Sequence, residues 1–143
     1  MKSLIDTNFL IYSHDEESPY FKRAHDKLEE VLFRGNAYFT PQVFLESYRV
    51  FTQAIKRPIP GLKAWEILRY YRNNPHVHIV YPTEQTMEYM EDVLSAYQVT
   101  GVKIFDLYLV ATMLTHNINT IYTHNVKDFQ MFKEIHVIDP LSV

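Results

Sequence analysis

The sequence predicts an α/β protein with a mostly parallel central sheet covered by helices. Short apolar segments alternate along the chain with longer segments whose apolar residues recur at helical spacing. This alternation favours parallel strands connected by helices that cross the faces of the sheet. With 143 residues, 47% of them hydrophobic, and no long linker or internal repeat, we expect one domain over residues 1–143.

The first predicted elements are a buried strand at residues 3–5, a helix, and an extended segment at residues 37–40. The strand is a short apolar run that stops at Asp6. Gly35 and Asn36 are residue types that commonly end a helix. The apolar residues at helical spacing before them are Phe21, Ala24, Leu28, Val31 and Leu32.

A second helix is predicted from Pro41, because proline suits the first turn of a helix, and it stops before Pro58 and Pro60. Residues 62–71 are expected to form another helix. The apolar residues of the helix that begins at Pro41 are Val43, Phe44, Tyr48, Val50, Phe51 and Ile55.

The second half of the chain continues the alternation. Residues 77–81 are a predicted strand, and Thr83 is a suitable cap for the helix that follows. Residues 104–114 are apolar almost all round, as expected of a helix packed on several sides. Strands are expected at 120–123 and 136–138. The face of the helix after Thr83 is marked by Met87, Met90, Val93, Leu94 and Tyr97.

Composition excludes several classes of protein. There is no cysteine, which excludes disulfides and thiolate metal sites. No apolar run approaches the roughly 20 residues that span a bilayer, and the N-terminus lacks the layout of a signal peptide. We therefore expect a soluble, cytoplasmic protein that does not bind membranes.

Acidic and amide residues follow the predicted strands or lie in the helices that come after them. Asp6 follows the first strand, and Asn125 and Asp128 follow the fourth. Asp106 stands in the first turn of the apolar helix, and Glu46 lies next to the apolar stripe of the helix after the second strand. In parallel sheets, ligands bind outside the carboxyl ends of the strands. Carboxylates clustered there would repel one another unless a cation joined them, and oxygen ligands suit a hard divalent cation.

Each acid also has a structural interpretation when it is taken alone. Asp6 can cap a helix after the strand, and Asp106 can simply favour a helix N-terminus, where the dipole stabilises an anion. Glu46 can pair with Arg49 or Arg34. These interpretations need no metal.

Four stretches of the chain resemble the ordered blocks of the PIN-domain family, and the size resembles its VapC toxin branch. The stretches are LIDTNFLIY (4–12), PQVFLESYRVF (41–51), GVKIFDLYLVATMLTHN (101–117) and TIYTHNVKDF (120–129). The resemblance implies a three-layer α/β sandwich and a metal-dependent ribonuclease that uses Mg²⁺ or Mn²⁺. It also implies an RNA substrate, an inhibitory antitoxin partner and a homodimer.

Carried over position by position, the resemblance assigns roles to individual residues. Asp6, Glu46 and Asp106 match the catalytic, metal-binding acids of the family, and Thr7 and Asn8 match the polar residues next to the first acid. We expect Thr7 and Asn8 to position phosphate or water.

One position departs from the family pattern. Many relatives have Asp where this chain has Asn125. Asn125 can cap a short helix whose first turn contains Asp128. Alternatively, Asn125 offers a neutral oxygen to the metal or its water, and Asp128 supplies the missing charge as a fourth metal ligand.

A basic segment between Arg49 and Arg72 contains six basic residues and one acid, interleaved with aromatic residues. Such a segment suits phosphates and unstacked bases, so we expect Arg49, Arg69 and Arg72 to contact RNA. The alternatives are a solvated helix face, or a surface that meets the antitoxin or a second copy of the chain.

Rival chemistries have weaker support. The chain has no G-x-S-x-G stretch and no glycine-rich phosphate loop. His76 and His78 would share one face of a strand, but a third ligand for Zn²⁺ is not evident. The alternative function is a catalytically inactive PIN-like module that binds nucleic acid or a protein partner.

Overall fold

The computed structural model of the chain describes residues 1–142. In this part of the chain, five strands form one sheet in the order β3-β2-β1-β4-β5, and every neighbouring pair is parallel. The strands are β1 (Ser3–Ile5), β2 (Ala37–Phe39), β3 (Val77–Ile79), β4 (Thr120–Tyr122) and β5 (His136–Ile138). The predicted mostly parallel sheet is therefore confirmed, although β2, β3 and β4 end earlier than the segments predicted for them.

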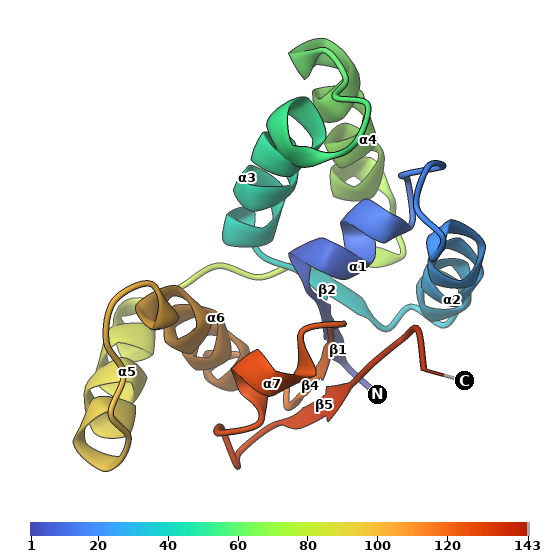
Figure 1. Ribbon diagram of the computed structural model, residues 1–143. Coiled ribbons are helices and arrows are strands. Elements are labelled where there is room, and N and C mark those ends of the chain that lie inside the picture. The colour runs from blue at the N-terminus through green and yellow to red at the C-terminus, as the bar shows by residue number, and fades with distance from the viewer. Residues whose placement is uncertain (143) are drawn as a thin grey trace.

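Helices connect all of these strands and flank the sheet (Figure 1). They are α1 (Thr7–Tyr12), α2 (Phe21–Phe33), α3 (Pro41–Arg49), the π-helix η1 (Val50–Ala54), α4 (Gly61–Asn73), α5 (Glu84–Ala96), α6 (Lys103–Thr115) and α7 (Val126–Phe129). The helix predicted from Pro41 is present, but its hydrogen-bond pattern changes from α to π at Val50. None of the helices in residues 1–142 is long and apolar enough to cross a membrane.

The strand order creates a switch point between β1 and β4. The chain adds β2 and β3 on one side of β1, and then returns to add β4 and β5 on the other side. Figure 1 shows α1 to α4 grouped apart from α5 and α6, on the two sides of the sheet. A crevice outside the carboxyl ends of strands at such a reversal is the usual ligand site in this architecture.

Local sequence explains where the main helices begin and end. The Thr40 hydroxyl accepts a hydrogen bond from Val43 N at 3.2 Å, and Pro41 occupies the first turn of α3. Thr83 is the N-cap of α5, as predicted. Gly35 follows α2 with a φ of 70°, a left-handed conformation that glycine adopts without steric cost.

The core runs through the sheet and the helices on both of its sides. Leu4, Phe9 and Ile121 are fully buried. Helix α6 is buried at Leu107 and from Leu109 to Met113, as its apolar sequence predicts, but Phe105 in its first turn is 56% exposed. These side chains hold the carboxyl ends of β1 and β4 in fixed positions.

Three residues predicted on buried faces are exposed. Met87 is 62% exposed, Leu94 42% and Tyr48 37%. Helix α5 packs mainly against α6, so that it buries only the narrow stripe of Thr86, Met90 and Val93. The faces of α5 and α3 that the apolar spacing predicted to be buried are therefore wider than the faces that the structure buries.

Candidate functional site

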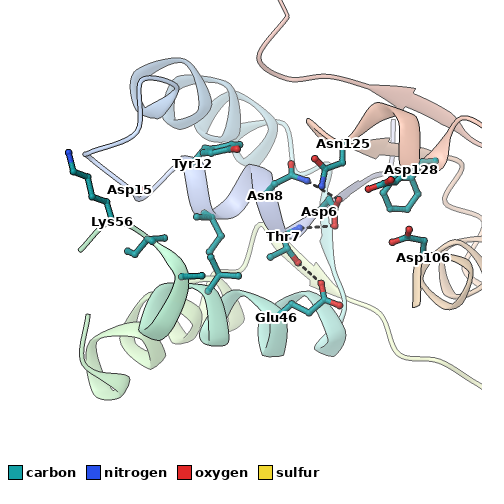
Figure 2. Close-up of a pocket in the computed structure, with 15 residues that line it drawn as sticks. Asp6, Thr7, Asn8, Tyr12, Asp15, Glu46, Lys56, Asp106, Asn125 and Asp128 are labelled. Atoms are coloured by element: carbon teal, nitrogen blue, oxygen red, sulfur yellow. Dashed lines mark hydrogen bonds between the residues drawn. The ribbon is translucent and has the colours of Figure 1, made fainter. Parts of the chain in front are cut away.

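Asp6 lies at the carboxyl end of β1 and caps α1. Its side chain is buried, with 7% of the residue exposed. The carboxylate accepts hydrogen bonds from Thr7 N at 2.8 Å, Asn8 Nδ2 at 3.2 Å and Thr123 Oγ1 at 2.8 Å. Figure 2 shows the contacts of Asp6 with Thr7 and Asn8 at the centre of the site. The capping interpretation of Asp6 is therefore correct. The donors that contact this buried carboxylate are neutral, so they do not offset its negative charge.

The electrostatic consequence is a carboxyl group that holds its proton unusually tightly. Burial raises the pKa of Asp6 to about 6, and the nearby charges of Glu46 and Asp106 raise this pKa further, whereas hydrogen bonds from Thr123 and Thr7 oppose the shift. A cation bound beside Asp6 would favour its charged form.

Asn8 and Thr123 connect α1 to the end of β4. Asn8 Nδ2 donates to Thr123 Oγ1 at 3.0 Å, and Asn8 Oδ1 accepts a hydrogen bond from the backbone of His124 at 2.8 Å. Asn125 N also donates to Thr123 Oγ1 at 3.0 Å. These contacts fix Asp6 relative to the loop that carries Asn125.

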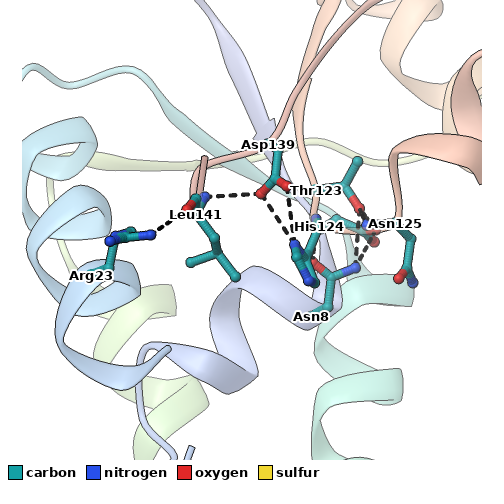
Figure 3. Close-up of polar contacts among 8 residues, drawn as sticks. Asn8, Arg23, Thr123, His124, Asn125, Asp139 and Leu141 are labelled. Atoms are coloured by element: carbon teal, nitrogen blue, oxygen red, sulfur yellow. Dashed lines mark hydrogen bonds and ion pairs between the residues drawn. The ribbon is translucent and has the colours of Figure 1, made fainter. Parts of the chain in front are cut away.

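A second set of contacts supports this loop from behind (Figure 3). The ring nitrogen Nδ1 of His124 lies 3.1 Å from Asp139 Oδ2. Leu141 N donates to Asp139 Oδ1 at 2.9 Å, and Arg23 Nη1 donates to the Leu141 carbonyl at 2.7 Å. The segment after β5 therefore links helix α2 to the loop beside Asp6.

Glu46 projects from α3 toward Asp6. Its Oε2 accepts a hydrogen bond from Thr7 Oγ1 at 3.1 Å, and its Oε1 accepts one from Gln42 Nε2 at 3.1 Å. The proposed ion pair with Arg34 is wrong, because Arg34 pairs with Glu30 on its own helix at 2.9 Å. In residues 1–142 no ion pair to Glu46 is formed, with Arg49 or any other residue.

Asp106 lies in the first turn of α6, as predicted, and is half-buried. Lys103 Nζ lies 3.3 Å from Asp106 Oδ2, and the same ammonium donates a hydrogen bond to the backbone carbonyl of Asp128. Burial raises the pKa of Asp106, Lys103 lowers it, and the charges of Asp128 and Glu46 raise it. Unlike Asp6, this carboxylate has a cation of its own.

One cavity of about 460 Å³ unites the predicted acidic and amide residues. Its lining includes Asp6, Thr7, Asn8, Glu46, Asp106, Asn125 and Asp128. Asn125 occupies the N-cap position of α7, but its side chain makes no capping hydrogen bond and faces the cavity instead. Asp128 lies in the first turn of α7, as both interpretations require.

The basic residues predicted to contact RNA lie elsewhere. Arg49, Arg69 and Arg72 are exposed and do not line this cavity. Arg69 borders a separate depression on α4 with Tyr70. Lys56, from the same basic segment, does line the acidic cavity.

The donor set suits a hard cation, but its side chains are hydrogen-bonded to the protein. As they stand, no three acidic or histidine side chains in residues 1–142 are close enough to hold one metal ion together. Glu46 is bound by Thr7 and Gln42, and Asp106 by Lys103. Carboxylate and amide oxygens in one cavity match the chemistry of Mg²⁺ and Mn²⁺, provided that these side chains rotate toward the ion.

Sequence reasoning missed Lys103, Thr123 and Gln42. Lys103 and Asp106 are three residues apart on a helix, a spacing that brings side chains together and could have indicated the pair. Gln42 and Glu46 have the corresponding spacing of four. Thr123 had no local signal, because its contact with Asp6 depends on the pairing of β1 with β4.

The chain is similar to several known proteins over its whole length. The PIN domain model matches residues 3–134. Ribonuclease VapC48 of Mycobacterium tuberculosis is 28% identical over 99% of both chains. A crystal structure of VapBC2 from Rickettsia felis bound to a promoter DNA fragment matches with a TM-score of 0.72 at 15% identity, over 96% of this chain and 98% of that chain. A toxin-antitoxin complex from Klebsiella pneumoniae matches with a TM-score of 0.65 at 19% identity, over 97% and 98%. The chain belongs to the PIN domain family.

Proposed function

We propose that this PIN domain protein is a Mg²⁺- or Mn²⁺-dependent endoribonuclease and the toxin of a toxin-antitoxin pair. The observation that carries the proposal is the environment of Asp6. Within residues 1–142 this buried carboxylate accepts hydrogen bonds from neutral donors only, and it shares a cavity with Glu46, Asp106 and Asp128. Such a group of carboxylates suits a divalent cation.

The similar proteins support the same proposal. VapC48 is named a ribonuclease, and the Klebsiella structure is a toxin-antitoxin complex. We extend the ribonuclease activity and the antitoxin partner to this chain. We further propose that it is a single PIN-like domain that acts on RNA in the cytoplasm and forms a homodimer.

The proposed reaction is hydrolysis of a phosphodiester bond. A water oxygen forms a bond to phosphorus, the bond from phosphorus to the leaving oxygen breaks, and a proton of the water passes to the leaving oxygen. A bound divalent ion would neutralise the phosphate and lower the pKa of the attacking water. Asp6, Glu46 and Asp106 would hold the ion, with Asp128 contributing charge from α7.

The polar residues around these acids have defined tasks in this scheme. Thr7 contacts Asp6 through its backbone and Glu46 through its hydroxyl, so it fixes the spacing of the two carboxylates. Asn8 and Thr123 orient Asp6. Asn125 faces the cavity with a side chain free of capping contacts and can position phosphate or water.

The experiment is RNA cleavage by purified protein with Mg²⁺, with Mn²⁺ and with a chelator. Structured and unstructured RNAs should be cut only when a divalent ion is present. Asp6→Asn should abolish cleavage, whereas the control Asp26→Asn, which changes an exposed acid on α2, should retain it. RNA binding with no dependence on divalent ions and no cleavage would instead support the inactive binding module.

A further inference from the structure

The ammonium of Lys103 is surrounded by groups that attract cations. Nζ lies 3.3 Å from Asp106 Oδ2 and donates a hydrogen bond to the backbone carbonyl of Asp128. The same atom lies 5.9 Å and 5.8 Å from the ring centroids of Phe129 and Phe132. A carboxylate, a carbonyl and two aromatic faces are groups that attract cations in proteins. Only 26% of the lysine side chain is exposed, so protein atoms surround most of it.

This ammonium lies where two carboxylates approach each other. Figure 2 places Asp106 and Asp128 next to each other at one end of the cavity, beyond Asp6 as seen from Lys56. They are close enough for the charge of Asp128 to act on Asp106. Two neighbouring carboxylates repel, and Lys103 offsets this repulsion by pairing with Asp106 while it binds the backbone carbonyl of Asp128.

Among residues 1–142, no lysine, arginine or histidine side chain pairs with the carboxylate of Asp6. The carboxylate of Asp6 is bound by Thr7, Asn8 and Thr123, all neutral donors. At the α7 end of the cavity, the lining also includes Asn125. Its amide is neutral and therefore does not help to attract a metal ion to the α7 end. The two ends of the cavity therefore differ in their need for a metal.

Resting on the proposed metal-dependent function, we propose that Lys103 is a resident cation that restricts the site to one divalent ion, bound on the Asp6 side. An ion placed between Asp106 and Asp128 would have to displace the ammonium or lie against it. Lys103 takes the place of a second metal by offsetting the charge of Asp106 next to Asp128. It is a positioning residue, because it acts through Asp106 and the α7 backbone.

A Mn²⁺ titration of the full chain tests the proposal, with free Mn²⁺ measured by electron paramagnetic resonance. The wild-type protein should bind one Mn²⁺ per chain. Lys103→Met keeps an unbranched stem against Phe129 and Phe132 but removes the charge, so this variant should bind two. Lys103→Arg should bind one. The control Lys133→Met, which removes an exposed charge outside the cavity, should also bind one.

Three results would overturn the inference: two Mn²⁺ ions bound by the wild type, two bound by Lys103→Arg, or only one bound by a Lys103→Met variant that keeps its circular dichroism spectrum. If Lys103→Met does not fold, binding of two ions by Lys103→Arg or by the wild type still contradicts the proposal. The failure of the proposed function looks different, because the wild type would then bind no Mn²⁺ and cut no RNA.

Discussion

The two ends of the acidic cavity differ in how the protein surrounds a carboxylate that is partly or fully removed from water. At the end of β1, Asp6 is held by neutral donors, and burial raises its pKa to about 6. At the start of α6, Asp106 is less buried and pairs with Lys103 at 3.3 Å. One carboxylate lacks a counter-charge from the protein and the other has one.

The difference shows how the cavity can be both stable and ready for a ligand. The pair of Lys103 and Asp106 reduces the repulsion between carboxylates without any bound ligand. An uncompensated buried carboxylate destabilises the fold, and a bound cation relieves that cost. We therefore expect a bound metal ion to stabilise the protein mainly through Asp6.

The largest expected effect is on catalysis, and it is the same at both ends. Asp6→Asn and Asp106→Asn should each abolish Mg²⁺-dependent RNA cleavage, because both carboxylates are proposed to hold the ion. Cleavage assays over a range of Mg²⁺ concentrations would show whether added metal restores either variant. Cleavage at the wild-type rate by both variants would rule out the metal site.

The next effect distinguishes the Asp6 end of the cavity from the Asp106 end, and it concerns the stability of the protein without metal. Because folding raises the Asp6 pKa from 3.8 to about 6, the free energy of unfolding should fall as pH rises through this window. Above pH 6, Asp6→Asn should therefore be more stable than the wild type by up to about 3 kcal/mol. Asp106→Asn should gain less, because Lys103 already offsets its charge.

Urea unfolding in a chelator at pH 4 and pH 8 measures this difference directly. The advantage of Asp6→Asn should be small at pH 4, where the wild-type carboxyl group is largely protonated in the folded state. A pH-independent difference would mean that Asp6 is not the titrating group.

A smaller effect is expected at the α7 side of the cavity. Asn125→Asp adds a negative charge to the lining, and we expect it to lower the Mg²⁺ concentration for half-maximal activity by about tenfold. Asp128→Asn should raise this concentration, and Mn²⁺ should activate the wild type better than Mg²⁺. If Asp128→Asn changes only the melting temperature, Asp128 is a helix-terminus residue and the site works with three carboxylates.

The smallest effect concerns the basic segment. Replacing a lysine or arginine that contacts phosphate reduces the slope of log affinity against log salt by about 1. Lys56→Gln should show this change because Lys56 lines the cavity. The double change of Arg69 and Arg72 to Gln tests whether α4 also meets RNA, and unchanged slopes would return that helix to a solvated face or a protein contact.

Much of the fold could be predicted because its signals are local. Short apolar runs identified the five strands, and proline, glycine and threonine marked the ends of the longer helices. Helix α1 had a weaker signal, the possible N-cap at Asp6. It has six residues, too few to show a helical period, and its apolar residues Phe9 to Ile11 follow the first strand almost directly.

The candidate site could be predicted in part for the same reason. Its acids were identified from their places after strands, at a helix start or, for Glu46, beside the apolar stripe of a helix, and all of them line one cavity. The contacts that distinguish Asp6 from Asp106 were not predicted. Thr123 reaches Asp6 only because β4 pairs with β1, and Lys103 reaches α7 only through the packing of α6 on α7. Such contacts between distant segments leave no pattern within a short stretch of sequence.

The measurement that tests the central claim most directly is calorimetric titration of Mn²⁺ into the wild type and into Asp6→Asn at pH 7.5. The account predicts saturable binding to the wild type and no binding to Asp6→Asn in the same concentration range. The control Asp26→Asn should bind as the wild type does. Equal binding by the wild type and Asp6→Asn would contradict the claim that Asp6 is the centre of a metal-dependent site.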